Sequence, residues 1–162
     1  MAELLNFKSS MDAFQVGRRA NMEEWNTVTG NNPNAAVIPF GAPVMASGTY
    51  NGCLEIDATT GRNVMGITEA SLMLPHPSDG YRQYDNVAVC EVGVIGVKVG
   101  ASAVTRGALA RWDTVNKVWT AAAQSATVVT IPGAQFAEDF AANSVGTVRY
   151  RRPVPSLSVS GA

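Results

Sequence analysis

The sequence is poor in charged residues, cysteine and histidine. Only 15% of its 162 residues are charged, compared with about a quarter in an average globular protein. Two cysteines, Cys53 and Cys90, and one histidine, His76, are too few for a disulfide scaffold or a structural zinc site. We therefore expect no metal and no cofactor. A surface with so little charge also suits a protein that is partly covered by a partner.

Motifs of common enzyme chemistry are missing from the sequence as well. It contains no Gly-x-Ser-x-Gly elbow, no phosphate loop and no dinucleotide-binding fingerprint. His76 lies between two prolines, a context typical of an exposed loop and not of a general base with an orienting partner. Glu138 and Asp139 are adjacent, so on a helix they would diverge. These features predict that the protein is not an enzyme.

The sequence also lacks long apolar runs and a strong excess of one charge. Its apolar stretches stay well below the ~20 residues of a membrane span. Residues 1–7 include Glu3 and show no signal-peptide pattern, so we expect no secretion signal and synthesis in the cytoplasm. The net charge of −1 is unlike that of a general nucleic-acid-binding domain. We expect neither a membrane nor a nucleic acid as partner.

Composition divides the chain into three parts. Residues 1–35 are polar, have no clean hydrophobic period and end in a Gly-Asn-Asn-Pro-Asn loop signal, so they are interpreted as an extended N-terminal arm with a turn-rich hinge. Residues 36–152 form the predicted domain. Residues 153–162 contain Pro153 and Pro155, which limit them to a tail or an edge strand.

The predicted domain contains about eight to ten short β segments, a spacing typical of a β-barrel or β-sandwich. The expected strands cover 37–40, 41–45, 53–57, 63–68, 86–99, 107–112, 117–120, 127–131 and 145–151. The clearest, 86–99, alternates with period two and contains glycines, which predict a bend, a bulge or the close approach of another backbone. Residues 134–142 are the one helix candidate in the domain. The fold class is therefore mainly β, with at most one short helix.

Two groups of residues are candidates for binding a partner. The arm carries apolar residues on a polar background, and these either dock on a partner or pack on the chain's own domain. Arg149, Arg151 and Arg152 form the densest charge cluster, which could face nucleic acid or, more consistently with the net charge, an acidic protein surface. On one strand, Arg149 and Arg151 would share a face and Arg152 would take the other.

Aromatic residues give an alternative. Trp112 and Trp119 flank a predicted hairpin turn at 113–116, and Tyr81 and Tyr84 lie nearby in sequence. The four rings could stack on sugars, which is typical of a carbohydrate-binding β module. Packing between the two tryptophans across the hairpin is the other explanation.

The order of small-residue motifs resembles that of a known family. The motifs are Gly41-Ala-Pro-Val44, Val64-Met-Gly-Ile67, the long segment 87–99, a Gly-Ala-Leu-Ala turn leading into Trp112-Asp113, and Val145-Gly-Thr-Val148. Over residues 36–152 this pattern resembles tailed-bacteriophage capsid decoration proteins, also called cement proteins, of the lambda head-decoration type. A first arm longer than that of the simplest cement proteins is the main departure.

The resemblance implies a structural virion protein, made in the host cytoplasm, on the outer surface of an icosahedral capsid. It implies binding to neighbouring major capsid protein subunits and to copies of itself, with a trimer favoured over a dimer. It implies no catalytic residue. The candidate capsid-binding residues are Leu4, Leu5, Phe7, Phe14, Val16, Arg18, Arg19, Trp25, Arg149, Arg151 and Arg152. A carbohydrate-binding β module on a phage particle is the alternative function.

Overall fold

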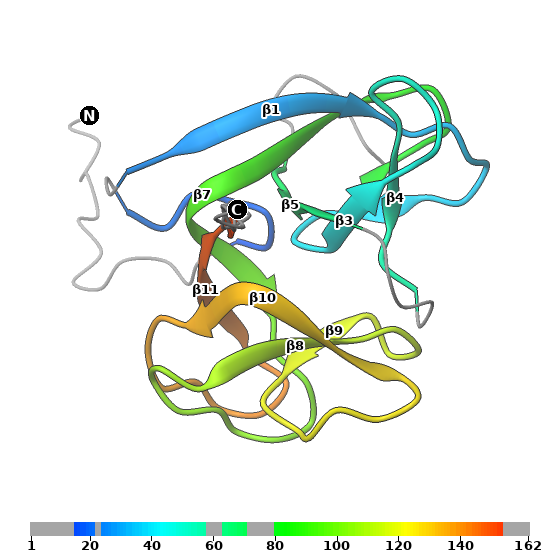
Figure 1. The fold of residues 1–162 in the computed structure, drawn as a ribbon. Helices are drawn as coiled ribbons and strands as arrows, with labels where there is room; N and C mark the ends of the chain where they lie inside the picture. Colours follow the sequence, from blue (N-terminus) through cyan, green and yellow to red (C-terminus); the bar gives the residue numbers. More distant parts are fainter. Residues whose placement is uncertain (1–14, 22–23, 58–62, 71–79, 154–162) are drawn as a thin grey trace, which may run out of the picture.

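The computed structural model describes residues 15–21, 24–57, 63–70 and 80–153. In these ranges the chain forms strands and no helix, which confirms the mainly β prediction. None of these ranges therefore holds a helix that could span a membrane. One large sheet curls into a half-barrel, and two very short strands form a second sheet (Figure 1).

The eleven strands follow one another along the chain. They are β1 Asn26–Asn31, β2 Ile38–Pro39, β3 Pro43–Ala46, β4 Cys53–Glu55, β5 Val64–Thr68, β6 Gly80–Tyr81, β7 Asn86–Lys98, β8 Leu109–Asp113, β9 Val118–Thr120, β10 Val128–Phe136 and β11 Val145–Arg151. The large sheet has the order β4-β3-β5-β7-β11-β10-β8-β9, with β1 also paired to β7, and β2 pairs with β6. The pairings between named strands are antiparallel.

Strand β7, the longest of the eleven, holds the two parts of the sheet together. Its first half pairs with β1 and β5, whereas residues 92–98 pair with β11. The glycine pattern predicted a close backbone approach, and Gly96 provides one: a Cβ there would lie 2.2 Å from the Gln15 carbonyl oxygen. The Gly17 amide donates to the Gly96 carbonyl at 2.7 Å. The absence of a side chain thus lets the segment before β1 lie directly against β7.

Strand β1 is a departure from the sequence-based prediction. Residues 26–31 were assigned to the arm and its hinge, but they pair along their whole length with β7. The Thr-Val-Thr run has high β propensity, and the Gly-Asn-Asn-Pro-Asn signal begins at the end of the strand instead of breaking it. The local sequence could not predict this strand, because its hydrogen-bonding partner β7 lies about 60 residues later in the chain.

The helix expected at residues 134–142 is also wrong. Ala134 to Phe136 are the last residues of β10, where Gln135 is exposed between two buried neighbours. That alternation has period two and not 3.6. The Phe136 and Ala137 amides donate to the Ala108 and Thr147 carbonyls, so the backbone bonds across the sheet and not along a helix.

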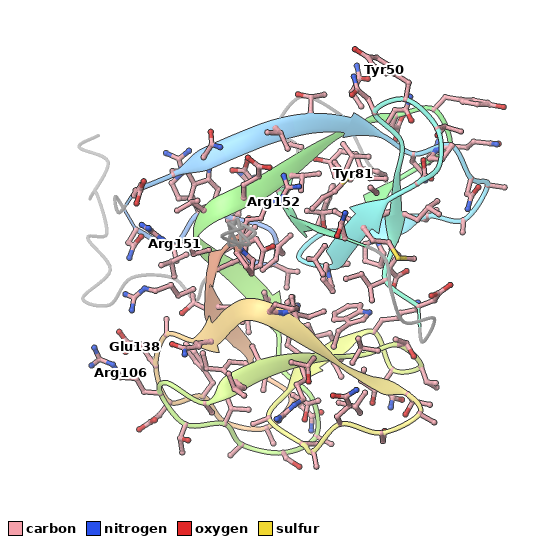
Figure 2. The ribbon with its side chains drawn as sticks, viewed as in Figure 1. Tyr50, Tyr81, Arg106, Glu138, Arg151 and Arg152 are labelled. Atoms are coloured by element: carbon pink, nitrogen blue, oxygen red, sulfur yellow. The ribbon has the colours of Figure 1, made fainter. Side chains whose placement is uncertain are left out.

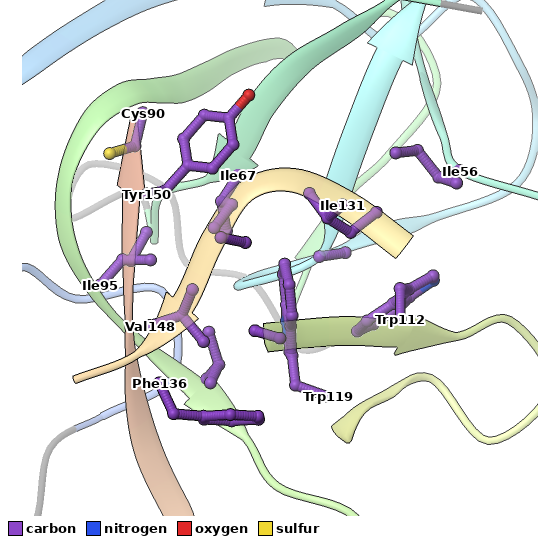
Figure 3. Close-up of a cluster of buried hydrophobic side chains, with 14 of the residues drawn as sticks. Ile56, Ile67, Cys90, Ile95, Trp112, Trp119, Ile131, Phe136, Val148 and Tyr150 are labelled. Atoms are coloured by element: carbon purple, nitrogen blue, oxygen red, sulfur yellow. The ribbon is translucent and has the colours of Figure 1, made fainter. Parts of the chain in front are cut away.

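The curled sheet closes around Trp119 of β9, which is completely buried (Figure 3). Its indole N–H donates to the carbonyl of Gly41 at 2.7 Å, across 78 positions of sequence. Its ring lies edge-on to that of Trp112, with centroids 5.7 Å apart. Near this point Lys117 Nζ lies 2.5 Å from Glu55 Oε1. The Trp119 bond joins β9 to the turn before β3, and the Lys117 pair joins the residue before β9 to β4, so the two ends of the sheet order lie close together.

The two tryptophans allow a matched test of this closure. Trp119→Phe leaves the buried Gly41 carbonyl without its donor, which costs about 1–3 kcal/mol beyond the lost volume. Trp112→Phe removes a buried indole N–H that has no partner among the described residues, so it should cost only packing. We expect urea unfolding to show the larger loss of stability for Trp119→Phe. Equal losses would contradict the role of this hydrogen bond.

Burial of ionisable groups predicts sensitivity to alkaline pH. Cys53 and Cys90 are free and buried, and desolvation raises the pKa of Cys53 to about 11 and that of Cys90 to about 12. The unfolded chain would lose these protons from about pH 9 while the folded chain keeps them, so stability falls as pH rises above 9. We expect the melting temperature to drop between pH 9 and 11, with a shallower drop in Cys90→Ala. A melting temperature independent of pH in this range would refute the argument.

Candidate functional site

The structure brings several of the predicted binding residues together beside the middle of β7 and the C-terminal end of β11. Leu4, Leu5, Phe7 and Phe14 lie outside the described residues. The remaining candidates, Val16, Arg18, Arg19, Trp25, Arg149, Arg151 and Arg152, come from two segments that are more than 120 positions apart in sequence. Both segments are placed by the second half of β7.

The placement follows from backbone pairing on β7. Arg19 forms a β-bridge with Ile95, and the Ala20 amide donates to the Val94 carbonyl at 2.9 Å. In β11, Val148 pairs with the same Ile95, and Arg149 pairs with Val94. The segment before β1 and the end of β11 therefore meet on one short stretch of strand, and they carry their arginines with them.

A missing side chain at Gly93 makes room for Trp25 beside these arginines. Gly93 has a φ of +151°, and a Cβ on it would lie 2.2 Å from Cε3 of the Trp25 ring. The guanidinium of Arg19 lies over the same ring, 4.3 Å from its centroid, as a cation–π contact. The indole N–H of Trp25 donates to Thr27 Oγ1 at 2.7 Å. The ring is thus held from three directions while it stays partly exposed.

Arg149 and Arg151 lie on one side of β11, as the alternation of a strand predicts, and Arg152 follows the end of the strand. Arg149 and Arg151 are exposed, whereas Val148 and Tyr150 between and before them are buried. Arg151 forms an ion pair with Glu24, and Arg152 forms one with Glu91. Figure 2 shows Arg151 and Arg152 near the end of β11, beside β7. The cluster is therefore tied to carboxylates of its own chain, one of which precedes β1.

We call Arg19, Trp25, Arg149, Arg151 and Arg152 the arginine patch. It brings together four guanidinium groups, and those of Arg151 and Arg152 form ion pairs with Glu24 and Glu91. A hollow of about 330 Å³ lies on it, lined by Glu24, Val92, Gly93, Arg149, Tyr150 and Arg151. Such a surface can bind carboxylates through guanidinium forks.

Val16 and Arg18 contribute differently from the patch residues. Val16 is half-buried, and a Cβ on Gly41 would lie 2.8 Å from its Cγ1, so Val16 packs against its own domain. The backbone carbonyl of Arg18 accepts a hydrogen bond from the Gly96 amide. Both residues anchor the segment before β1 to the sheet.

The rings considered for sugar stacking are mostly inside the protein. Trp112, Trp119 and Tyr81 are at most 2% exposed, and only Tyr84 lies on the surface. The two tryptophans pair across the β8–β9 hairpin, as the packing explanation predicted. Tyr50, which was not among the predicted binding residues, is 91% exposed. Its position after Ser-Gly-Thr and before Asn-Gly was the available signal of an exposed loop.

The described residues hold few groups suited to catalysis. They contain no cluster of three or more His, Cys, Asp or Glu that could hold a metal ion. The thiols of Cys53 and Cys90 are buried, and burial raises both pKa values, which disfavours the nucleophilic thiolate. His76 lies outside the described residues. The exposed side chains described above are suited to binding a partner through charged and aromatic contacts.

A glycine substitution tests how the patch is built. Gly93→Ala places a methyl group against the Trp25 ring and strains the backbone at its positive φ. We expect it to lower stability by about 1–3 kcal/mol, as overpacking does. Gly48→Ala is the control, because a methyl group at that position would have no neighbour within 4 Å. Thermal unfolding that is the same for both variants would contradict the described packing of Trp25.

Comparison with known proteins gives the chain a family. Residues 6–151 match the family described as "Structural cement protein (E217 gp24/Pam3 gp6)". A solved chain from "The capsid of Myoviridae Phage XM1" has a similar fold, with a TM-score of 0.72 and 16% sequence identity over 95% of this chain and 100% of that one. No curated protein matches the sequence.

The family match covers the sheet, every patch residue except Arg152 and most of the segment before β1, and the solved capsid chain has a similar fold over its entire length. The resemblance noticed in the small-residue motifs is thereby confirmed. The chain belongs to the phage structural cement protein family.

Proposed function

We propose that this protein binds the outer surface of the capsid and holds neighbouring major capsid protein subunits together. Membership of the cement family gives it a structural, capsid-stabilising role in the virion. The observation that carries the finer proposal is the arginine patch, because it is the place where β7 assembles residues from both ends of the described chain. Its guanidinium groups suit acidic side chains on a capsid subunit.

The ion pairs of the patch are suited to exchange. The side chains of Arg151 and Glu24 are 70% and 69% exposed, and a pair this exposed contributes about 1 kcal/mol or less to folding. Arg151 could therefore leave Glu24 for a carboxylate on a capsid subunit at little cost. In contrast, the Glu91 side chain is only 15% exposed and also accepts a hydrogen bond from the Asn26 side chain. The Arg152–Glu91 pair therefore contributes more to stabilising the fold than to exchange with a partner.

Many copies on one shell make weak contacts effective. A single exposed arginine contributes little, but a protein that touches two subunits at once gains from the high effective concentration of the second site. Residues 1–14, which include Leu4, Leu5, Phe7 and Phe14, precede the anchored segment at Val16 to Ala20. We include these four apolar residues in the proposal as an arm that adds contact area on the capsid.

Substitution of two arginines tests the patch. Arg149→Ala with Arg151→Ala should leave the melting temperature nearly unchanged, because both side chains are exposed. It should weaken binding to purified shells about tenfold and flatten the salt dependence of binding. Pelleting of shells with increasing protein, at several salt concentrations, measures both effects.

Arg106→Ala is the control for charge, because Arg106 is exposed and precedes β8, which β10 separates from the arginines of β11. The proposal requires this variant to bind shells like the wild type. Undiminished binding by the double variant, or an equal loss with Arg106→Ala, would remove the patch from the binding surface. Retention on the inside of the shell in electron micrographs would overturn the outer-surface placement.

A further inference from the structure

Over residues 27–29, strand β1 has one edge whose backbone groups bond to no described residue. Its other edge pairs with β7 along residues 26–31. Figure 1 shows β1 as the outermost strand along the upper rim of the sheet. The backbone of Asn31 marks the end of the open edge, because its amide donates to the Asn51 carbonyl at 2.8 Å and its carbonyl accepts from Cys53 Sγ.

The alternation of a strand identifies the open groups. Successive residues direct their N–H and C=O groups to opposite edges, and Asn31 directs its pair away from β7. Thr27 and Thr29 therefore do the same, while Val28 and Gly30 face β7. No described residue bonds the amide or carbonyl of Thr27 or Thr29. Two residues thus offer two donors and two acceptors in a row on the surface.

This edge lacks the features that usually protect one. Natural edge strands commonly carry Lys, Pro or an inward-pointing charge that prevents pairing with another chain. The sequence of β1 is Asn-Thr-Val-Thr-Gly-Asn, with no charge and no proline. Its one irregularity, at Asn26/Thr27, lies before the open pair of threonines. The edge is therefore available for strand addition.

A large exposed side chain lies next to the same edge. Tyr50, at 91% exposure, precedes Asn51, the residue bonded to the end of β1. Figure 2 shows Tyr50 above the C-terminal end of β1. An aromatic ring left in solvent beside unpaired backbone is typical of an interface and adds contact area that the strand alone lacks.

We propose that the open edge of β1 binds the same edge of a second copy of this protein, as an antiparallel pair around a two-fold axis. With Val28 opposite Val28 of the second copy, Thr27 lies opposite Thr29 in both directions. Each of these two pairs exchanges two hydrogen bonds. All four open groups of each copy then have a partner, and none is left over.

A second copy fits this edge better than a charged peptide does. A two-fold contact brings each residue near its own counterpart, and the uncharged β1 meets its copy without repulsion. Thr–Thr pairs across strands are favourable. The antiparallel arrangement also moves Tyr50 toward the N-terminal end of β1 in the other copy. The contact is isologous, so it gives a dimer and not the trimer favoured by the sequence analysis.

The dimer should be weak and depend on concentration, because two short strands and two tyrosines bury less than the ~1,200 Å² of a standard interface. Sedimentation velocity of the full chain up to about 1 mM would detect it. Thr29→Pro removes an amide that has no partner in the monomer, so it should give a monomer that melts near the wild-type temperature. Thr29→Val keeps the amide and should still dimerise.

A charge pair tests the register without proline. In the proposed pairing, Thr29 and its counterpart are diagonal neighbours about 7–8 Å apart. Thr29→Lys and Thr29→Glu should each weaken the dimer about tenfold by like-charge repulsion, and an equal mixture should recover it. Val28→Pro is the folding control, because it breaks the bond to β7 and should lower the melting temperature.

The proposal is overturned by a wild type that stays monomeric throughout the concentration range. It is equally overturned by a Thr29→Pro or Thr29→Lys variant that dimerises like the wild type, or by a Lys and Glu mixture that stays monomeric. None of these measurements uses capsids. Failure here would therefore leave the proposed capsid binding through the arginine patch untouched.

Discussion

The buried hydrogen bond from the Trp119 indole to the Gly41 carbonyl is the contact on which the closed shape of the sheet depends. It joins β9, at one end of the sheet order, to the turn before β3, close to the other end. The apolar interior of the curled sheet must be shielded from water where the two ends of the sheet meet. Trp119 supplies both the volume and the polar contact, and Lys117 with Glu55 adds an ion pair near the seam.

Strand β7 turns this closed sheet into a surface for recognition. Residues 92–98 of β7 pair both with β11 and with the segment before β1. Arginines from these two segments therefore lie beside the same stretch of β7 backbone. Gly93 and Gly96 allow this close packing, because at each position a neighbouring residue occupies the space that a side chain would need. The arginine patch and the open edge of β1 are both consequences of what pairs with β7. They lie on separate residues, so a capsid contact and a self-contact could operate together.

Local pattern was sufficient for most of the strands. Alternation predicted β7, β8, β9 and β11, and the parity of β11 correctly placed Arg149 and Arg151 opposite Tyr150. Pattern failed where the deciding partner is far away in sequence. The run at 26–31 was interpreted as a hinge because Asn and Gly favour turns, yet pairing with β7 makes it a strand. Residues 134–142 have Phe136, Ala137 and Phe140 at helical spacing, yet bonds to the Ala108 and Thr147 carbonyls hold Phe136 and Ala137 in the sheet.

The sequence by itself determined the β class, the structural role implied by its motifs, and the identity of the basic cluster, because these depend on residue type and on spacing within a few positions. Only the tertiary structure decided which of those residues meet. It buried Trp112, Trp119 and Tyr81 that might have stacked on sugars, and it paired Arg151 with Glu24. It also left the edge of β1 open. These outcomes depend on contacts between residues many tens of positions apart, and the free energy of such contacts comes from the folded sheet as a whole.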